Sequence, residues 1–194
     1  QANDERAQQH RRAQQAAAVC AAPSVVSSRP RLAGAAAPQA VHAGDLSAAR
    51  DALARGASAA GPRDERFPEP LLREAIRQDS RDLVVLLLEH RADPNAPLDS
   101  GETLLVQAVR EASAPVVQAL LRAGARPDER LPNGSTALHE AARVGKIDVA
   151  SDLLAGGASA KIVLEDGTSA AEIARRFGHD RLASLLRQKG APAR

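Results

Sequence analysis

The stretch Asn133-Gly-Ser-Thr-Ala-Leu-His-Glu-Ala-Ala-Arg-Val-Gly145, followed by Lys146-Ile-Asp-Val-Ala-Ser-Asp-Leu-Leu-Ala-Gly-Gly-Ala158, carries the pattern of two short helices. Apolar residues recur at i, i+3 and i+4 in each half, first at Leu138, Ala141 and Ala142 and then at Val149, Leu153 and Leu154. Gly145 separates the two patterns, and Gly157 follows the second, where a left-handed residue commonly closes a helix. The stretch therefore predicts a helix–turn–helix unit.

On both sides of this unit the same residue types return every 33 positions. The aligned columns are Leu72, Leu105, Leu138 and Ala171; Ala75, Ala108, Ala141 and Ala174; Leu87, Leu120, Leu153 and Leu186; Gly124, Gly157 and Gly190; and Ala92, Ala125, Ala158 and Ala191. Arg91 stands in the glycine column, so we expect a strained left-handed backbone there. Neither helix of a unit could bury its apolar face alone, so the units must stack on one another.

The pattern divides the chain into a tail and five repeats. The predicted segments are a tail or helix plus linker over 1–34, a degenerate capping repeat over 35–64, repeats over 65–97, 98–130 and 131–163, and a C-terminal capping repeat over 164–194. Within the tail, Gln1 to Val19 has the composition of an Ala-rich helix, and Cys20 to Pro38 is typical of a linker. Arg187 replaces the leucine of inner copies, as expected where a terminal repeat meets water.

These residues resemble the ankyrin repeat, whose signature reads G-x-T-P-L-H-x-A-A-x-x-G and then L-L-x-x-G-A. The resemblance covers about residues 35–190 and is strongest over Asn133 to Ala158. It implies an all-α fold, an ankyrin-repeat solenoid of stacked helix–turn–helix repeats joined by short hairpin loops. It also implies that Thr136 and His139 exchange hydrogen bonds at the start of a first helix.

The sequence offers no catalytic, cofactor or metal site. His139-Glu140 begins like H-E-x-x-H, but Arg143 stands where the second zinc ligand would be. The single cysteine, Cys20, excludes an intramolecular disulfide, and the glycines recur at repeat turns rather than in a phosphate-binding loop. We therefore expect no enzyme activity and no cofactor.

The resemblance further implies that a partner binds the concave side, which is made of loop tips and the exposed edge of the first helices. The predicted concave surface comprises Arg66, Phe67, Glu69, Arg77, Gln78, Asp99, Ser100, Glu102, Arg110, Glu111, Pro132, Asn133, Ser135, Arg143, Val144, Glu165, Asp166, Thr168, Arg176 and Phe177. Its mixed charges suit a protein more than a phosphate backbone. For Phe67 a partner-binding role and a packing role stay open, and for Phe177 packing into the last groove between repeats is favoured.

The expected function is a non-catalytic module that binds another protein as an adaptor, inhibitor or accessory factor. One alternative is an exported effector whose tail serves in targeting or tethering, and a weaker one is polyanion binding through the tail. Residues 1–44 hold five arginines against Asp4 and Glu5, whereas the rest of the chain is nearly balanced, so nucleic acid is not the expected partner. The chain has no apolar run of membrane-spanning length and lacks methionine. We expect a soluble protein, cytoplasmic or exported, whose array is monomeric unless the N-terminal segment self-associates.

Overall fold

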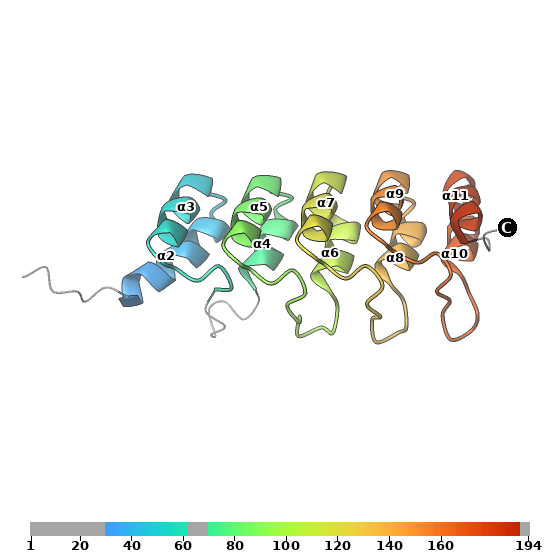
Figure 1. The fold of residues 1–194 in the computed structure, drawn as a ribbon, viewed down its shortest axis with the longest axis horizontal. Helices are drawn as coiled ribbons and strands as arrows, with labels where there is room; N and C mark the ends of the chain where they lie inside the picture. The colour runs from blue at the N-terminus through green and yellow to red at the C-terminus, as the bar shows by residue number, and fades with distance from the viewer. Residues whose placement is uncertain (1–29, 62–69, 191–194) are drawn as a thin grey trace, which may run out of the picture. The chain divides into compact units, whose positions relative to one another are not determined.

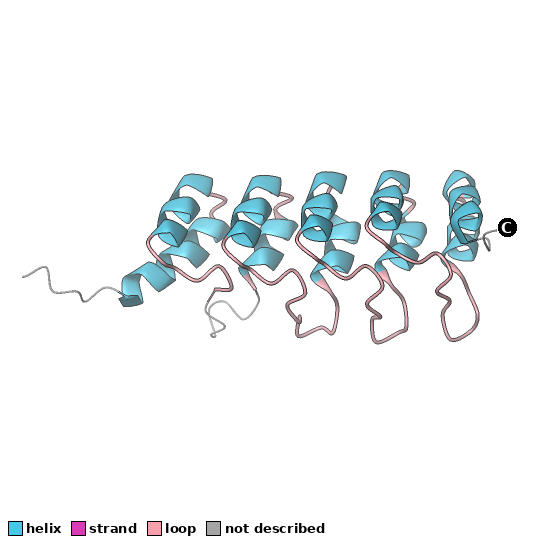
Figure 2. Cartoon of the chain, viewed as in Figure 1, coloured by secondary structure: helices cyan, strands magenta, loops and turns pink. Residues whose placement is uncertain are grey.

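In the computed structural model, residues 30–61 and 70–190 are described, and every regular element in these ranges is an α-helix (Figure 1). The helices are α2 (Pro30–His42), α3 (Leu46–Ala54), α4 (Leu71–Arg77), α5 (Arg81–Glu89), α6 (Leu104–Glu111), α7 (Ala114–Arg122), α8 (Ala137–Val144), α9 (Ile147–Ala155), α10 (Ala170–Arg176) and α11 (Asp180–Gly190). All-helical architecture is thus confirmed, and the longest helix-free segments of the described ranges are the loops before α6, α8 and α10 (Figure 2).

Within the compact unit of residues 31–194, the helices form pairs that stack side by side. The first helices α4, α6, α8 and α10 contact one another in order, and so do the second helices α3, α5, α7, α9 and α11 (Figure 1). Small residues make this close approach feasible, because Ala75, Ala108, Ala141 and Ala174 are all 0% exposed. The leucine columns are buried as well, so the paired, stacked arrangement expected from the columns is confirmed.

The first helices α6, α8 and α10 begin at polar residues that bond to their first turn. The Thr136 hydroxyl lies 2.9 Å from Nδ1 of His139, and the Thr136 N–H donates to the same nitrogen over 3.3 Å. Ser169 and Glu172 form the corresponding capping box at the start of α10, and Thr103 caps α6 through the Val106 N–H. The exchange expected between Thr136 and His139 is confirmed.

The loops before α8 and α10 are short hairpins. The Leu131 N–H donates to the Ser135 carbonyl over 2.8 Å, and the Leu164 N–H donates to the Thr168 carbonyl over 2.9 Å. Gly134 and Gly167 turn each tip with φ values of 76° and 81°, which a residue with a side chain adopts only with strain. Side chains also tie neighbouring loops together, because Asn95 accepts from the Arg126 N–H over 2.9 Å.

The N-terminal end departs from expectation. The predicted linker over Cys20 to Pro38 is wrong from Pro30 onward, because Pro30–His42 is helix α2. Two prolines obscured this helix: Pro30 opens it, where its missing N–H is harmless, and Pro38 lies inside it. Burial of Ala37 and Val41, both 0% exposed, offsets the lost hydrogen bond. The predicted Ala-rich helix over residues 1–19 lies outside the described residues.

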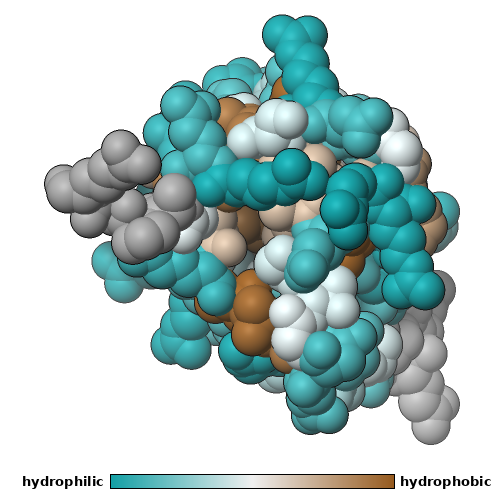
Figure 3. All heavy atoms as spheres, turned by 90° about the vertical axis from the view of Figure 1, so that its right-hand side faces the viewer, coloured by the Kyte–Doolittle hydropathy of each residue, from teal (hydrophilic) through white to brown (hydrophobic). Residues whose placement is uncertain are grey.

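Two positions of the glycine column differ from the others. Arg91 has φ 66°, so the expected left-handed backbone is confirmed. Gly190 is instead the last residue of α11, and the expectation of a turn there is wrong. A Cβ at Gly190 would stand 3.2 Å from the Ala160 carbonyl oxygen, so glycine permits a close approach rather than a left-handed turn. The end of the array is largely hydrophilic, and Arg187 is exposed there as expected of a cap (Figure 3).

The residue before each of the second helices α7, α9 and α11 forms a joint with the preceding repeat. Ser113 donates to the Asp79 carboxylate through both its N–H and its hydroxyl, each over 2.8 Å. Lys146 donates from Nζ to the carbonyls that end α6, over 2.8 Å to Ala112 and 3.2 Å to Arg110. At the next repeat the His179 ring lies so close to Gly145 that a Cβ on this glycine would collide with it. The three joints share a position but differ in chemistry.

Candidate functional site

Seventeen of the predicted concave-surface residues lie in the described ranges, whereas Arg66, Phe67 and Glu69 lie outside them. The exposed ones are Arg77, Asp99, Ser100, Glu111, Pro132, Asn133, Arg143, Val144, Glu165, Asp166, Arg176 and Phe177, and the half-buried ones are Gln78, Glu102, Arg110 and Thr168. Ser135 is only 4% exposed, and its hydroxyl donates to Asn133 Oδ1 over 2.7 Å. The prediction of Ser135 as a contact residue is therefore wrong, because this side chain stabilises the loop.

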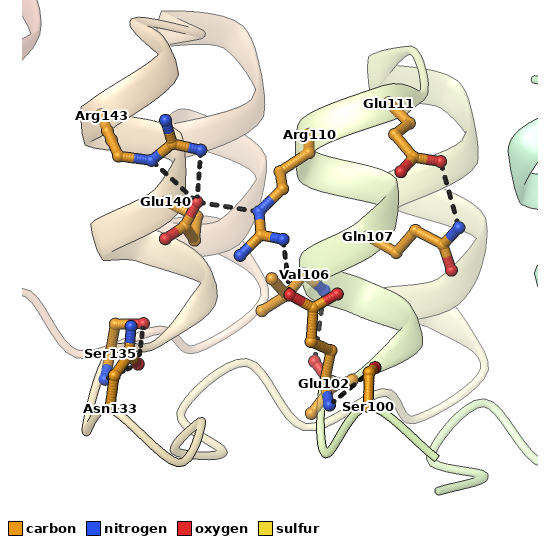
Figure 4. A network of polar contacts seen from close by, with 11 residues as sticks. Ser100, Glu102, Val106, Gln107, Arg110, Glu111, Asn133, Ser135, Glu140 and Arg143 are labelled. Atoms are coloured by element: carbon orange, nitrogen blue, oxygen red, sulfur yellow. Dashed lines mark hydrogen bonds and ion pairs between the residues drawn. The ribbon is translucent and has the colours of Figure 1, made fainter. Parts of the chain in front are cut away.

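An ion-pair network joins the first helices of the third and fourth repeats (Figure 4). Arg110 donates from Nη1 to Glu102 over 2.6 Å and from Nε to Glu140 over 3.0 Å. Arg143 donates to the same oxygen of Glu140 from Nε and Nη2, over 3.1 and 2.9 Å. A single carboxylate oxygen thus serves two guanidinium groups from adjacent repeats.

Glu140 is the buried centre of this network, with a side chain only 8% exposed. Burial disfavours its charge, but the hydrogen bonds from Arg110 and Arg143 outweigh that effect and hold the pKa of the Glu140 carboxyl below its usual value. Because a buried carboxylate must keep its partners, Arg110 is bound to the fold. Arg110 is thus not a freely solvated surface arginine, and its side chain is only 30% exposed.

In the second repeat the corresponding side chains are also satisfied internally. Arg77 donates to Glu74 over 2.7 and 3.0 Å, and these hydrogen bonds lower the pKa of Glu74 although burial acts against them. The Gln78 amide donates to the Val41 carbonyl over 2.8 Å and so ties this repeat to the end of α2. In the third repeat, the Gln107 amide donates to Glu111 over 3.0 Å.

The C-terminal part of the surface is different, because apolar side chains are exposed there. Val144 at the end of α8 is 36% exposed, and Phe177, one repeat later directly after α10, is 54% exposed. The favoured packing role for Phe177 is therefore wrong. Its backbone N–H closes the last turn of α10 while the ring is left in solvent. Arg143 and Arg176, the residues before them, are exposed too.

His139 lies beneath this surface and has a structural role. It is 2% exposed, and burial lowers the pKa of its imidazole, with the charge of Arg130 acting in the same direction. The neighbouring backbone of Ile162, in the next loop, opposes that shift. Nδ1 accepts from Thr136, so the neutral ring carries its hydrogen on Nε2. In residues 30–61 and 70–190 no cluster of three or more potential metal ligands includes this or any other histidine.

Comparison with known families identifies the fold. A family model described as ankyrin repeats, in three copies, matches residues 105–193. Residues 105–193 are ankyrin repeats. Ankyrin repeats generally serve as protein–protein interaction modules and are typically non-catalytic. No curated protein matches the chain.

The ankyrin match covers α7 to α11 and all of α6 except its first residue. It therefore includes Arg110, Glu140 and the exposed Phe177 but not Glu102. Among the described residues, no ankyrin helix or other helix is both long and apolar enough to cross a membrane.

Sequence reasoning missed the acidic partners of the surface arginines. Glu74 and Glu140 are three residues before Arg77 and Arg143, a helical spacing that predicts contact within a turn. This spacing is visible in the sequence of each helix. The second bond of Glu140, to Arg110 in the preceding repeat, needs the packing of α6 against α8 and could not be read from one helix.

Proposed function

We propose that this ankyrin array binds another protein through the predicted concave surface and acts as an adaptor, inhibitor or accessory factor. The observation that carries the proposal is a contrast between two columns of the same helices. The buried column keeps alanine in all four copies, at Ala75, Ala108, Ala141 and Ala174. The column at the end of the first helices changes completely, from Gln78 and Glu111 to Val144 and Phe177.

This contrast supports a role in recognition. The repeated column makes each repeat fit its neighbour, whereas the changing column gives each repeat a different surface chemistry. Carboxylates, guanidinium groups, amides and apolar side chains alternate along the array, as in protein interfaces that combine an apolar centre with a polar rim. A phosphate backbone would require a continuous basic stripe, and acidic Glu102, Glu111, Glu165 and Asp166 interrupt it.

Site-specific photo-crosslinking in cells tests the proposal. A photoreactive amino acid replaces exposed Asp99 or Glu111 on the predicted concave surface in one set of full-length variants. In the matched set it replaces exposed Arg122 or Arg181 on the second helices α7 and α11. We expect the first set to crosslink one protein specifically and the second set to lose it. The purified protein should then bind the unmodified chain in calorimetry.

Two results would contradict the proposal. Crosslinking of the same protein from Arg122 or Arg181 alone would place the interface on the second helices. Full binding by concave-surface variants, together with loss of binding when residues 1–29 are removed, would make the tail the binding element and the array a spacer.

A further inference from the structure

The predicted concave surface is closed by internal contacts in its N-terminal half and open in its C-terminal half. Gln78 and Glu111, at the ends of the earlier first helices, accept or donate hydrogen bonds within the fold. Val144 and Phe177 occupy the same position one and two repeats later and leave 36% and 54% of their surface in water. An exposed phenylalanine is therefore a feature of this end of the array.

The arginines beside these positions follow the same gradient. Arg77 is paired with Glu74, and Arg110 is held by Glu102 and Glu140. Arg143 shares its Glu140 oxygen with Arg110. Arg176, the last of the series, forms no ion pair with any residue of 30–61 or 70–190.

Asp166, whose carboxylate senses the charge of Arg176, is already engaged in other contacts. Asp166 accepts the Thr168 N–H over 2.8 Å, and its contacts with Thr168 hold the pKa of this exposed carboxyl low, with only a minor contribution from Arg176. Exposed Arg143 and Val144 therefore lie at the end of α8, and exposed Arg176 and Phe177 lie at the end of α10. The one carboxylate paired with Arg143, that of Glu140, is buried and is shared with Arg110. Exposed Glu165 and Asp166 belong to the same repeat as Arg176, but no ion pair joins either of them to this arginine. This end of the surface can therefore take up further carboxylates and apolar side chains.

We propose that this end of the array binds an acidic protein segment that carries apolar residues. The inference rests on the proposed function and specifies the chemistry of the partner. Carboxylates of the segment pair with Arg143 and Arg176, and its apolar side chains cover Val144 and Phe177. Nucleic acid fits less well, because a sugar–phosphate chain would satisfy the guanidinium groups but leave both apolar side chains in water.

The repeat geometry sets the spacing expected in such a segment. Neighbouring packed helices lie roughly 8–10 Å apart, and an extended chain advances about 3.3 Å per residue. Val144 is the last residue of α8, and Phe177 directly follows α10, the adjacent first helix. A segment that covers both therefore carries apolar residues about three positions apart, with Asp or Glu beside them.

Selection from a random peptide library displayed on phage tests this chemistry with the full chain. Selected peptides are then synthesised in three forms: as found, with every acidic residue changed to lysine, and with every apolar residue changed to serine. Fluorescence polarisation measures their binding to the wild type and to Arg176→Ala and Phe177→Ser, with Arg181→Ala and Arg187→Ala on α11 as matched controls. All four side chains are exposed, so the melting temperatures should stay unchanged.

We expect peptides that combine acidic and apolar residues, and binding that each concave variant weakens about tenfold, equivalent to about 1.4 kcal/mol. The lysine and serine forms should each lose binding. Selected peptides without acidic enrichment that depend on Asp99 or Glu111 would overturn the inference and leave the proposed function standing. A single-stranded DNA probe that depends on Arg176 but not on Phe177 would also overturn it. Failure to select any peptide that depends on both residues would do the same.

Discussion

Arg91 and Asp79 are the two non-glycine residues in the described ranges with positive φ, at 66° and 51°. They differ in what the side chain contributes. Asp79 uses its carboxylate to accept two hydrogen bonds from Ser113 in the next repeat, which offsets a strained backbone. Arg91 is exposed and occupies a column in which later copies have glycine with φ 91° and 97°. Only at Arg91, therefore, does no side-chain contact offset the backbone strain.

Replacement of Arg91 by glycine should increase the free energy of unfolding, by up to about 1 kcal/mol, because relief of the left-handed backbone exceeds the added entropy of the unfolded chain. Urea denaturation followed by circular dichroism measures the change. Asp79→Gly is the control and should destabilise, since Ser113 loses its acceptor. A lower stability of Arg91→Gly would show that the arginine side chain holds its neighbours.

The network around Glu140 predicts unequal roles for its two arginines. Arg110→Ala should lower the free energy of unfolding by about 1–3 kcal/mol, because the buried carboxylate loses a partner. Arg143→Ala should lower it by less than about 1 kcal/mol, since its side chain is 46% exposed and Arg110 remains. Thermal unfolding of both variants checks the order. Equal losses would indicate that Glu140 depends on both groups alike.

His139 should make stability depend on pH. Burial lowers the pKa of its imidazole below the ordinary value of 6.5, so the unfolded chain takes up a proton before the folded chain does. Stability contributed by the neutral ring is complete above pH 6.5 and falls as the pH decreases below that value. Melting temperatures between pH 7.5 and 5 should decline in the wild type and less in His139→Asn, while Glu140 stays ionised. An unchanged slope in the variant would assign the decline to other groups.

Each helix pair contributes a narrow interface lined by alanine. Ala141 in α8 is 0% exposed, and Ala155 near the end of α9 is exposed, although both are helical alanines of the same repeat. A larger side chain at Ala141 would separate the neighbouring first helices, because protein interiors are packed without voids of that size.

Ala141→Leu should therefore overpack the contact of α8 with its neighbours and lower the free energy of unfolding by about 1–3 kcal/mol. Ala155→Leu should leave it nearly unchanged. Differential scanning calorimetry of both proteins gives the comparison. Coincident melting of Ala141→Leu and the wild type would mean that this column does not lie between the first helices.

Helices with a repeated register were predictable from the sequence, because Leu138, Ala141 and Leu153 occupy columns that local periodicity exposes. Helix α2 was not, since its two prolines suggest a linker and only its tertiary contacts offset them. The sequence predicted which residues form the surface better than it predicted whether each side chain is buried or exposed. Ser135 is buried through its bond to Asn133 in the same loop, a local contact that the repeat pattern does not indicate. The exposure of the Phe177 ring depends on how the repeats pack, which the sequence of one repeat does not encode.

The whole array is stabilised by contacts between neighbours only, so a weakened joint should act locally. Gly145 has φ 82°, and a Cβ there would collide with the His179 ring at the start of the last helix. Gly145→Ala should therefore loosen α10 and α11 more than the rest. Hydrogen exchange should show faster exchange in these helices while α4 to α7 keep their protection.

Gly157→Ala is the matched control for this whole-array effect. Its φ of 97° imposes a similar backbone strain, but a Cβ would meet no atom within 4 Å. We expect a smaller loss of protection in α10 and α11. Uniformly faster exchange along the array in Gly145→Ala would indicate that the repeats unfold together rather than one by one.

The three unlike joints also restrict how the gene for this chain could be rearranged. Repeat proteins change length by duplication or deletion of whole copies. Because the buried alanine and leucine columns are nearly the same in every copy, the core would still pack after such an event. Excision of residues 146–178 would put His179 in the place of Lys146, against the end of α6. The Arg110 and Ala112 carbonyls would then lose the Lys146 ammonium group. The His179 ring, which now lies against Gly145, would face Ala112 and its Cβ. The joints between repeats thus fit only one order of the copies. A recombined chain would keep a well-packed core but would have joints whose residues do not match.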